Sequence, residues 1–416
     1  MAEAKISILP LLRALSESPD AIAPEDITKA ITHSFNDHLS PVQTGTLLTT
    51  LHFTKLDQKP EIIAAAARAM RAAGLTVDGL QADTWGDETS GGKYGGGLVS
   101  PASELGARSV ADNGQVDIVG TGGDGHDTFN VSTTSAILAS GCGLRICKHG
   151  NKASTSASGS ADILTSLGAN LMAITPPIVT SIFNEPSKGN FCFLYAPVFH
   201  PAVRHVAPIR RELGHRTIFN LLGPLANPID YSVSGGLEAR IIGVGRRELG
   251  QVFAETLKIL GASKGMVVCG EEGLDEVSCE CRTECWRLLE DPETREVTVD
   301  HFFVHPTETF GIPTHSLSRV AGGKGPDENA AILERLLNGK ERDDEKAVKD
   351  FVLANTAALI AISGLLGPVE RVSEGAVARG AVWRSAVEKA NEGITSGRAW
   401  EEWSKFVEKS RQAEGG

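Results

Sequence analysis

Residues 120–134 of the chain read GTGGDGHDTFNVSTT, directly after the short apolar stretch VDIV at 116–119. The segment holds four glycines, two aspartates and several hydroxyl side chains, but only two large apolar residues, Phe129 and Val131. So few packing atoms exclude a core element, whereas many backbone N–H groups and side-chain oxygens are typical of an anion-binding loop. We interpret the segment as a loop between a strand at 116–119 and a helix at about 132–140.

The same order of strand, loop and helix recurs further along the chain. Expected strands lie at 144–147, 239–244 and 266–269, and expected helices lie at about 158–167, at 248–260 and over most of the chain after residue 326. Alternating strands and helices are typical of a mainly parallel sheet with helices on its faces. The larger part of the chain is therefore predicted to be an α/β domain with its loops at one edge of the sheet.

Composition limits the classes of protein to be considered. The chain has 416 residues, of which 41% are hydrophobic and 22% charged, and its net charge is −12. About two or three domains are expected at this length. The net negative charge disfavours nonspecific binding to nucleic acid or to an anionic membrane. No apolar run reaches the roughly 18 residues that span a membrane, and the N-terminus lacks the pattern of a signal peptide, so we expect a cytoplasmic protein.

The chain is expected to divide into a small and a large domain. Residues 1–76 have helical apolar patterns and prolines at expected helix starts, so they predict a small helical domain, joined by helices within about 176–214. Residues 77–114 are polar and rich in glycine, which indicates a linker. Residues 115–416 form the expected α/β domain. The sequence NLLGPLANP at 220–228 is interpreted as a turn that shapes a connection.

Seven cysteines, an odd number in a long chain, indicate reduced thiols. Cys279, Cys281 and Cys285 raise the alternative of a zinc site, but their spacing lacks a C-x-x-C pair and a nearby histidine. We expect free thiols on an inserted surface hairpin at about 279–300.

Two loops are predicted to meet at one edge of the sheet. Ligands of open α/β folds bind beyond the carboxyl ends of the strands, where the glycine-rich loop is expected to lie. Its glycines let bare N–H groups approach an anion, and the hydroxyl of Ser132 is a candidate Mg²⁺ ligand. Lys148-His149-Gly150-Asn151-Lys152, after the next expected strand, adds cationic and polar groups to the same volume. The loop matches neither the P-loop nor the dinucleotide-binding pattern.

Three motifs of the chain together resemble the anthranilate phosphoribosyltransferase family of the tryptophan pathway. They are GTGGDG…FNVST, KHGN…SGSADIL and FNLLGPLANP. The resemblance implies transfer of the phosphoribosyl group from phosphoribosyl pyrophosphate (PRPP) to anthranilate, with Mg²⁺ as the cofactor and a homodimer as the assembly. It implies PRPP contacts at Gly120, Gly123, Asp124, Thr128, Asn130, Ser132, Thr133, Lys148 and Ser160. It implies anthranilate contacts at Gly120, Asn151 and Arg210, and metal ligands at Ser132, Asp275 and Glu276.

Two features depart from the family pattern. The family usually has arginine where this chain has Lys152, so a planar fork for an anion is replaced by a point charge. The segments 77–114 and 279–300 look longer than the common pattern and suit surface insertions.

The chemistry of the transfer is consistent with these residue types. Displacing pyrophosphate requires stabilisation of the leaving group's charge, and anthranilate's amine is already neutral at pH 7, so no strong base is required.

Some residues keep an alternative role. His149 is a candidate for assisting catalysis, and the alternative is a structural histidine. For Asp275 and Glu276, the alternative is an acidic helix start. Two rival functions are a nucleoside phosphorylase of the same fold and a nucleic-acid-binding relative. GTGGDG and NLLGPLANP disfavour the first, and the net negative charge and the retained Asp275 and Glu276 disfavour the second.

Overall fold

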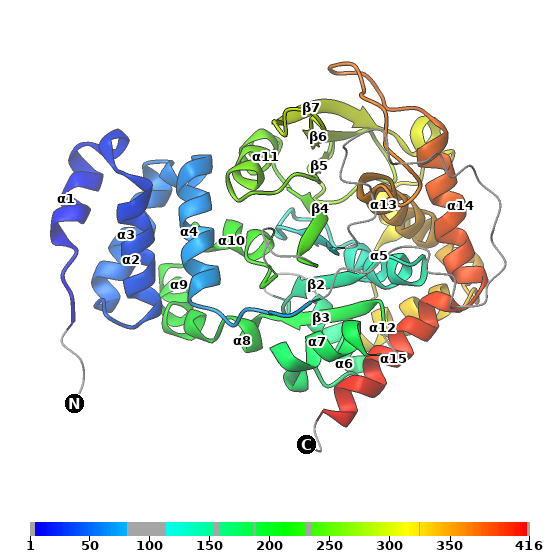
Figure 1. Cartoon of the computed structure of the whole chain (residues 1–416), viewed down its shortest axis with the longest axis horizontal. Coiled ribbons are helices and arrows are strands. Elements are labelled where there is room, and N and C mark those ends of the chain that lie inside the picture. The colour runs from blue at the N-terminus through cyan, green and yellow to red at the C-terminus, as the bar shows by residue number, and fades with distance from the viewer. Residues whose placement is uncertain are drawn as a thin grey trace.

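The computed structural model describes residues 5–80, 114–153, 158–185, 189–229, 231, 235–323 and 325–413. The predicted linker at 77–114 lies almost entirely outside these residues. The first helices are α1 (Leu9–Glu17), α2 (Pro24–Phe35), α3 (Pro41–Phe53) and α4 (Pro60–Ala72). They lie side by side at one end of the molecule (Figure 1).

Proline and capping residues set where the N-terminal helices begin. A proline occupies the first or second position of all four, where the missing N–H costs no helical hydrogen bond. The Ser40 side chain accepts from the Gln43 N–H at 3.3 Å and caps α3. Gln43 does not complete a capping box, because its Oε1 accepts from the Ile8 N–H at 2.7 Å and ties α1 to α3.

A seven-stranded sheet forms the centre of the larger part, in the order β3-β2-β1-β4-β5-β6-β7. Its strands are β1 (Gln115–Gly120), β2 (Ile146–Gly150), β3 (Phe191–Tyr195), β4 (Leu237–Gly243), β5 (Gly265–Gly270), β6 (Thr283–Glu290) and β7 (Val297–Val304). The first five pair in parallel, and the hairpin β6–β7 extends the sheet in antiparallel pairing. The predicted α/β architecture is confirmed.

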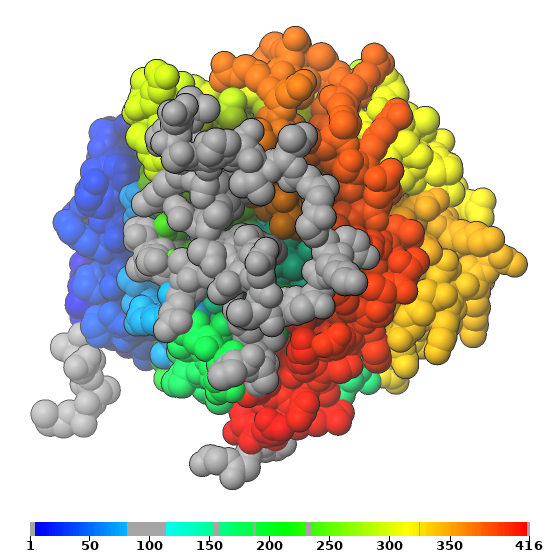
Figure 2. All heavy atoms as spheres, turned by 45° about the vertical axis from the view of Figure 1, so that its right-hand side comes forward, coloured from blue at the N-terminus to red at the C-terminus, as the bar shows by residue number. Residues whose placement is uncertain are grey.

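Helices cover the sheet and complete the molecule. They are α5 (Val131–Gly141), α6 (Ser160–Ser166), α7 (Pro176–Asn184), α8 (Ala196–Phe199), α9 (Ala207–Leu213), α10 (Phe219–Leu225), α11 (Leu249–Ile259), α12 (Pro326–Leu337), α13 (Lys346–Ser363), α14 (Ala381–Thr395) and α15 (Arg398–Gln412). In the view of Figure 2, the C-terminal helices lie at the right and the N-terminal helices at the left of the molecule. Among the described residues, no helix has the length and apolarity needed to cross a membrane.

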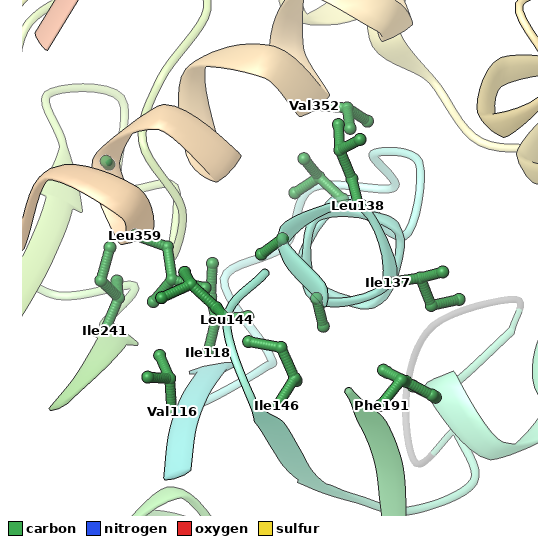
Figure 3. Close-up of a cluster of buried hydrophobic side chains, with 14 of the residues drawn as sticks. Val116, Ile118, Ile137, Leu138, Leu144, Ile146, Phe191, Ile241, Val352 and Leu359 are labelled. Carbon is green, nitrogen blue, oxygen red and sulfur yellow. The ribbon is translucent and has the colours of Figure 1, made fainter. Parts of the chain in front are cut away.

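Alternate residues of the central strands enter two hydrophobic cores. Ile241, Met266 and Val268 belong to the core that also contains α5 and α13 (Figure 3). Ile242 and Val267 face the other way, into a core shared with α11 and the N-terminal helices. This alternation follows from the two-residue period of a strand. Because one core continues from the sheet into α1–α4, the helical part is fixed to the α/β part by packing.

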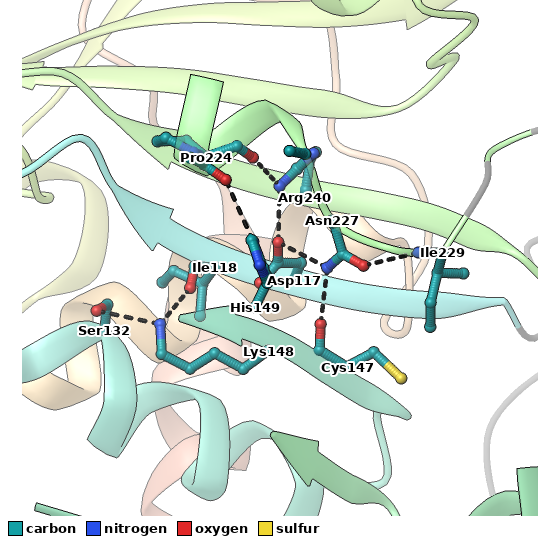
Figure 4. A network of polar contacts seen from close by, with 12 residues as sticks. Asp117, Ile118, Ser132, Cys147, Lys148, His149, Pro224, Asn227, Ile229 and Arg240 are labelled. Carbon is teal, nitrogen blue, oxygen red and sulfur yellow. Dashed lines mark hydrogen bonds and ion pairs between the residues drawn. The ribbon is translucent and has the colours of Figure 1, made fainter. Parts of the chain in front are cut away.

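A buried polar network crosses the sheet from β1 to β4. Arg240 and Asp117 form a fully buried ion pair at 2.7 Å. Asn227 donates to Asp117 at 3.0 Å and to the Cys147 carbonyl of β2 at 2.9 Å, and Arg240 also donates to the Pro224 carbonyl (Figure 4). Removing one partner of such a pair leaves an uncompensated charge and costs about 3–5 kcal/mol. The network therefore fixes the segment 223–227 against two central strands.

Three local predictions from the sequence are wrong. The segment 219–225 is the helix α10, with Pro224 inside it, not a turn. The second strand runs from Ile146 to Gly150, so Lys148 and His149 belong to a buried strand and not to the loop after it. The expected hairpin at 279–300 forms between Thr283 and Val304, but it does not stand apart on the surface, because β6 pairs with β5 of the central sheet and Cys279 and Cys285 are buried.

Candidate active site

The glycine-rich loop lies where the strand order of the sheet reverses. From β1 the chain continues to β2 and β3 on one side, and later returns to β4 and β5 on the other. Ligands of open α/β sheets bind at this switch point, beyond the carboxyl ends of the strands. The Thr121 N–H donates to the Gly243 carbonyl at 2.9 Å, so the loop begins in contact with the end of β4. The predicted position of the loop is confirmed.

Asp275 supports the loop from the connection between β5 and β6. Its Oδ2 accepts from the Gly122 N–H at 2.6 Å. A Cβ at Gly120 would lie 2.5 Å from the same carboxylate oxygen, and a Cβ at Gly243 would lie 1.5 Å from the Asp275 carbonyl oxygen. Only glycine at both positions lets Asp275 approach the two strand ends.

Positive backbone torsions shape the middle of the loop. Gly122, Gly123 and Gly125 have φ values of 68°, 69° and 88°, which side chains rarely adopt. Asp124, between them, accepts from the His126 N–H at 3.1 Å and from the Asp275 N–H at 3.3 Å. Its carboxylate thus joins the loop to the segment that carries Asp275 and Glu276.

Buried charges of both signs lie beneath the loop. Burial, and then the neighbouring Asp124, raise the pKa of Asp275 to about 7. Burial also raises the pKa of Glu276 well above its ordinary value, with a smaller contribution from Asp275, whereas Lys148 and Ser132 lower it. The Lys148 pKa is lowered by burial, against the raising effect of the nearby acids. A carboxylate pair with raised pKa values gains from a bound cation that favours its charged form.

Lys148 reaches the loop from below. Its Nζ donates to the Ile118 carbonyl at 2.6 Å and to Ser132 Oγ at 3.3 Å, and only 1% of the side chain is exposed. Through this hydrogen bond the lysine contacts Ser132, one of the candidate Mg²⁺ ligands (Figure 4).

Hydrogen bonds join the glycine-rich loop to the loop after β2. Thr133 Oγ1 donates to Ser160 Oγ at 2.8 Å, so the starts of α5 and α6 meet. Asn130 and Ser158 exchange two hydrogen bonds of 3.0 Å each, and Asn329 Nδ2 donates to Ser158 Oγ at 2.9 Å. The predicted meeting of the two loops is confirmed for these residues.

Three other predicted site residues lie outside this set of contacts. Thr128 is on the far side of the loop, where its backbone pairs with Ala321. Asn151 is exposed directly after β2 and its Oδ1 accepts from the Lys152 N–H at 2.8 Å. Arg210 is half-buried on α9, with its guanidinium 5.4 Å from the ring centre of Phe219. No described contact joins Arg210 to either loop.

His149 has the environment of a structural histidine. Its Nδ1 lies 3.2 Å from the Gly223 carbonyl, and its ring meets His200 edge-on with 5.0 Å between the ring centres. Burial, and then the neighbouring His200, lower its pKa well below 6.5. A buried neutral imidazole that donates to a backbone carbonyl supports the structural alternative over the catalytic one.

Oxygen atoms suited to Mg²⁺ gather at one end of the loop. Ser132, Asp275 and Glu276 provide a hydroxyl and two carboxylates, the ligand types that Mg²⁺ prefers. Among the residues that the structure describes, no group of three or more His, Cys, Asp or Glu side chains could hold a metal alone. The set fits Mg²⁺ because this ion commonly takes one or two carboxylates and completes its shell with substrate phosphates and water.

Sequence reasoning missed two glycines at the end of β4 and one arginine. Gly243 ends β4 and Gly245 follows it in a Gly-x-Gly pattern, and a Cβ at Gly245 would lie 2.8 Å from that of Asp124. The pattern at a strand end was a readable signal. Arg216 donates to the Gly123 carbonyl at 3.2 Å and to the Gly122 carbonyl at 3.4 Å, and no sequence pattern marks it.

Two family models match the chain. They are the helical bundle domain of a glycosyl transferase family at residues 9–74 and the a/b domain of the same family at residues 112–400. Anthranilate phosphoribosyltransferase of Schizosaccharomyces pombe is 41% identical over 392 residues, 94% of this chain and 94% of that protein. The chain belongs to the anthranilate phosphoribosyltransferase family.

Further relatives of this family agree in sequence and in structure. The enzyme of Saccharomyces cerevisiae is 37% identical over 88% of this chain and 85% of its own length. Its structure in complex with PRPP and Mg has a TM-score of 0.76 at 33% identity, over 97% of this chain and 98% of that one. Its complex with 4-fluoroanthranilate has a TM-score of 0.74 at 31% identity, over 97% of each chain. The resemblance inferred from the sequence is confirmed.

Replacing Gly123 by valine tests the loop as an anion cradle. Valine resists the φ of 69°, and its Cβ would lie 3.0 Å from Arg216 Nη1, so the loop must change shape. We expect KM for PRPP to rise at least about tenfold, because one lost charge-assisted contact has that effect. Steady-state kinetics with varied PRPP measures it, and far-ultraviolet circular dichroism checks the fold. Unchanged saturation by PRPP in a folded variant would show that the loop is not the cradle.

Proposed function

We propose that this chain transfers the phosphoribosyl group of PRPP to the amine of anthranilate, giving N-(5-phosphoribosyl)anthranilate and pyrophosphate in tryptophan biosynthesis. The observation that carries the proposal is the glycine-rich loop at the switch point of the sheet, next to Ser132, Asp275 and Glu276. A loop of backbone donors beside oxygen ligands for a cation suits a pyrophosphate leaving group. Family membership supports the same reaction.

The glycine-rich loop and the buried acids are assigned different roles in binding PRPP. Gly120 allows the close approach of Asp275, and Gly123 and Asp124 contribute N–H groups with no hydrogen-bond partner in the described part of the chain. Mg²⁺, held by Ser132, Asp275 and Glu276, would neutralise charge on the leaving pyrophosphate. The other PRPP contacts that we assign are Thr128, Asn130, Thr133, Lys148 and Ser160.

Positioning, and not proton transfer, is the main contribution of the protein. The ribosyl carbon gains oxocarbenium character as pyrophosphate leaves, as in glycoside cleavage. The neutral aryl amine attacks this carbon without prior deprotonation and releases its surplus proton to solvent after the C–N bond has formed. The lowered pKa of His149 fits a residue that takes no part in proton transfer. Gly120, Asn151 and Arg210 are assigned to anthranilate, so that its amine is held in line with the ribosyl carbon.

The reaction requires a direct test with its cation. We expect purified protein to form phosphoribosyl anthranilate from PRPP and anthranilate in the presence of Mg²⁺, because Asp275 and Glu276 are poised to take a cation. The loss of anthranilate fluorescence follows the reaction. Activity should disappear after exhaustive chelation and return when Mg²⁺ is added back. Phosphorolysis of thymidine or uridine, with no transfer to anthranilate, would favour a nucleoside phosphorylase instead.

Substitution of Arg210 tests the anthranilate contact. A guanidinium meets the carboxylate of anthranilate with charge-assisted bonds of roughly 1.5–3 kcal/mol, so Arg210→Ala should lower kcat/KM for anthranilate about ten- to a hundredfold. KM for PRPP should change little. Arg210→Lys should recover only part of the loss, because a point charge does not reproduce the fork.

Arg211 provides the matched control for Arg210. It is the next residue on α9 and is exposed, whereas Arg210 is half-buried. Arg211→Ala should leave the kinetics for both substrates unchanged. The opposite pattern, with damage from Arg211→Ala and none from Arg210→Ala, would assign the role to the other arginine.

We further propose the division into domains that the sequence suggested, with residues 1–76 and parts of 176–214 in the helical domain. The contacts of α3 with α9 support this division, whereas α7 packs with α15 and β3.

We also propose a homodimer that forms through the N-terminal helices, where Val42 and Phe53 of α3 are 77% and 73% exposed. Light scattering should give two chains per particle, and a 44 kDa species at micromolar concentration would contradict the dimer.

We also propose a cytoplasmic location, which the seven free cysteines support.

A further inference from the structure

Arg216 contacts the glycine-rich loop from a separate part of the chain. It lies between α9 and α10, and its guanidinium donates to the carbonyl oxygens of Gly123 at 3.2 Å and Gly122 at 3.4 Å. The side chain is exposed and has no ion pair among the residues that the structure describes. A single side chain therefore holds two successive peptide groups of the loop by their oxygen atoms.

The geometry of the peptide bond turns this contact into a constraint on the N–H groups. In a trans peptide the carbonyl and the N–H point in opposite directions. The carbonyls of Gly122 and Gly123 share their peptide groups with the N–H groups of Gly123 and Asp124. Both N–H groups consequently point away from Arg216, and neither has a hydrogen-bond partner among the described residues. Successive unpaired N–H groups of this kind form an anion-binding concavity.

The backbone of Arg216 is fixed independently of the loop. Gly214 ends α9 with a φ of 68°, and Thr217 N–H donates to Asn220 Oδ1 at 2.9 Å at the start of α10. Ile218 and Phe219 are buried in the core shared with the N-terminal helices, where Phe219 meets Phe35 edge-on at 5.6 Å. The packed helical part thus holds the backbone of Arg216 in place, and the Arg216 side chain in turn restrains the glycine-rich loop. Without such a contact the loop would be flexible, because glycine allows many backbone conformations.

We propose that Arg216 is a positioning residue that preorganises the glycine-rich loop for pyrophosphate by fixing the N–H groups of Gly123 and Asp124 toward the anion. The inference rests on the proposed function, since it names the residue that shapes the cradle. Preorganised donors bind an anion more tightly because their ordering cost is met before binding. Arg216 touches the loop, and the loop touches the substrate.

Calorimetric titration of Arg216 variants with pyrophosphate in excess Mg²⁺ tests the role. We expect Arg216→Ala to raise the dissociation constant of pyrophosphate about tenfold, the loss typical of one charge-assisted hydrogen bond. KM for PRPP should rise by a similar factor, with KM for anthranilate unchanged. Arg216→Lys should recover only part of the affinity, because its single ammonium cannot hold both carbonyls. Arg211→Ala, at an exposed arginine five positions away, should match the wild type.

A double substitution separates action through the loop from direct attraction of the anion. A Cβ at Gly123 would lie 3.0 Å from Arg216 Nη1, whereas a Cβ at Gly325, where the φ of −169° suits any residue, meets nothing within 4 Å. In the Gly123→Ala background, Arg216→Ala should therefore cost less affinity than in the wild type. In the Gly325→Ala background, it should cost the full factor.

Each outcome decides between named alternatives. Full recovery by Arg216→Lys, or equal losses in both glycine backgrounds, would overturn positioning in favour of simple charge attraction. Pyrophosphate affinity unchanged in Arg216→Ala would overturn the inference while the proposed function stands. No binding of pyrophosphate by the wild type would instead count against the proposed function itself.

Discussion

The contact between Asp275 and the ends of β1 and β4 is the constraint on which the rest of the site depends. Its carboxylate accepts from the Gly122 N–H, and its main chain lies against Gly243 so closely that no Cβ fits there. This single residue joins the loop after β1, the end of β4 and the connection from β5 to β6. The sheet order places these three at one edge, and Asp275 holds them together.

The same contact creates an electrostatic imbalance that suits a cation. Holding Asp275 and Glu276 beside Asp124 raises the pKa of both acids, mainly because they are buried. The ammonium group of Lys148 offsets part of the negative charge of these acids, but burial lowers the pKa of Lys148. In the function that we propose, the buried acids would hold Mg²⁺ and the loop's N–H groups would bind the pyrophosphate.

The sequence predicted those parts of the fold and site that depend on local pattern. The glycine-rich loop, α5 and four of the five parallel strands follow from composition and periodicity, and they were predicted within a few residues. The fifth parallel strand, β3 at Phe191–Tyr195, was not predicted. The placement of Lys148 was wrong, because its charge suggested a loop while buried partners at Ile118 and Ser132 let it stay in a strand. The segment 279–300 was misjudged because a hairpin that pairs with a sheet edge has the same local pattern as an exposed one.

Contacts between distant segments were beyond sequence reasoning. Arg216 meets Gly123 across 93 positions through backbone carbonyls, which leave no trace in the side-chain pattern. The link from Asn227 to Asp117 and Cys147 is of the same kind, and it gives NLLGPLANP a structural role in holding β1 and β2. The resemblance to a family supplied residue roles that the pattern alone left open between functional and structural alternatives.

A crystal structure of the protein with Mg²⁺ and pyrophosphate tests the central claim most directly. The account predicts pyrophosphate oxygens within about 3.2 Å of the backbone nitrogens of Gly123 and Asp124. It also predicts the cation beside Ser132, Asp275 and Glu276, with Arg216 still on the carbonyls of Gly122 and Gly123. Pyrophosphate bound elsewhere, with those two N–H groups unpaired, would contradict the account.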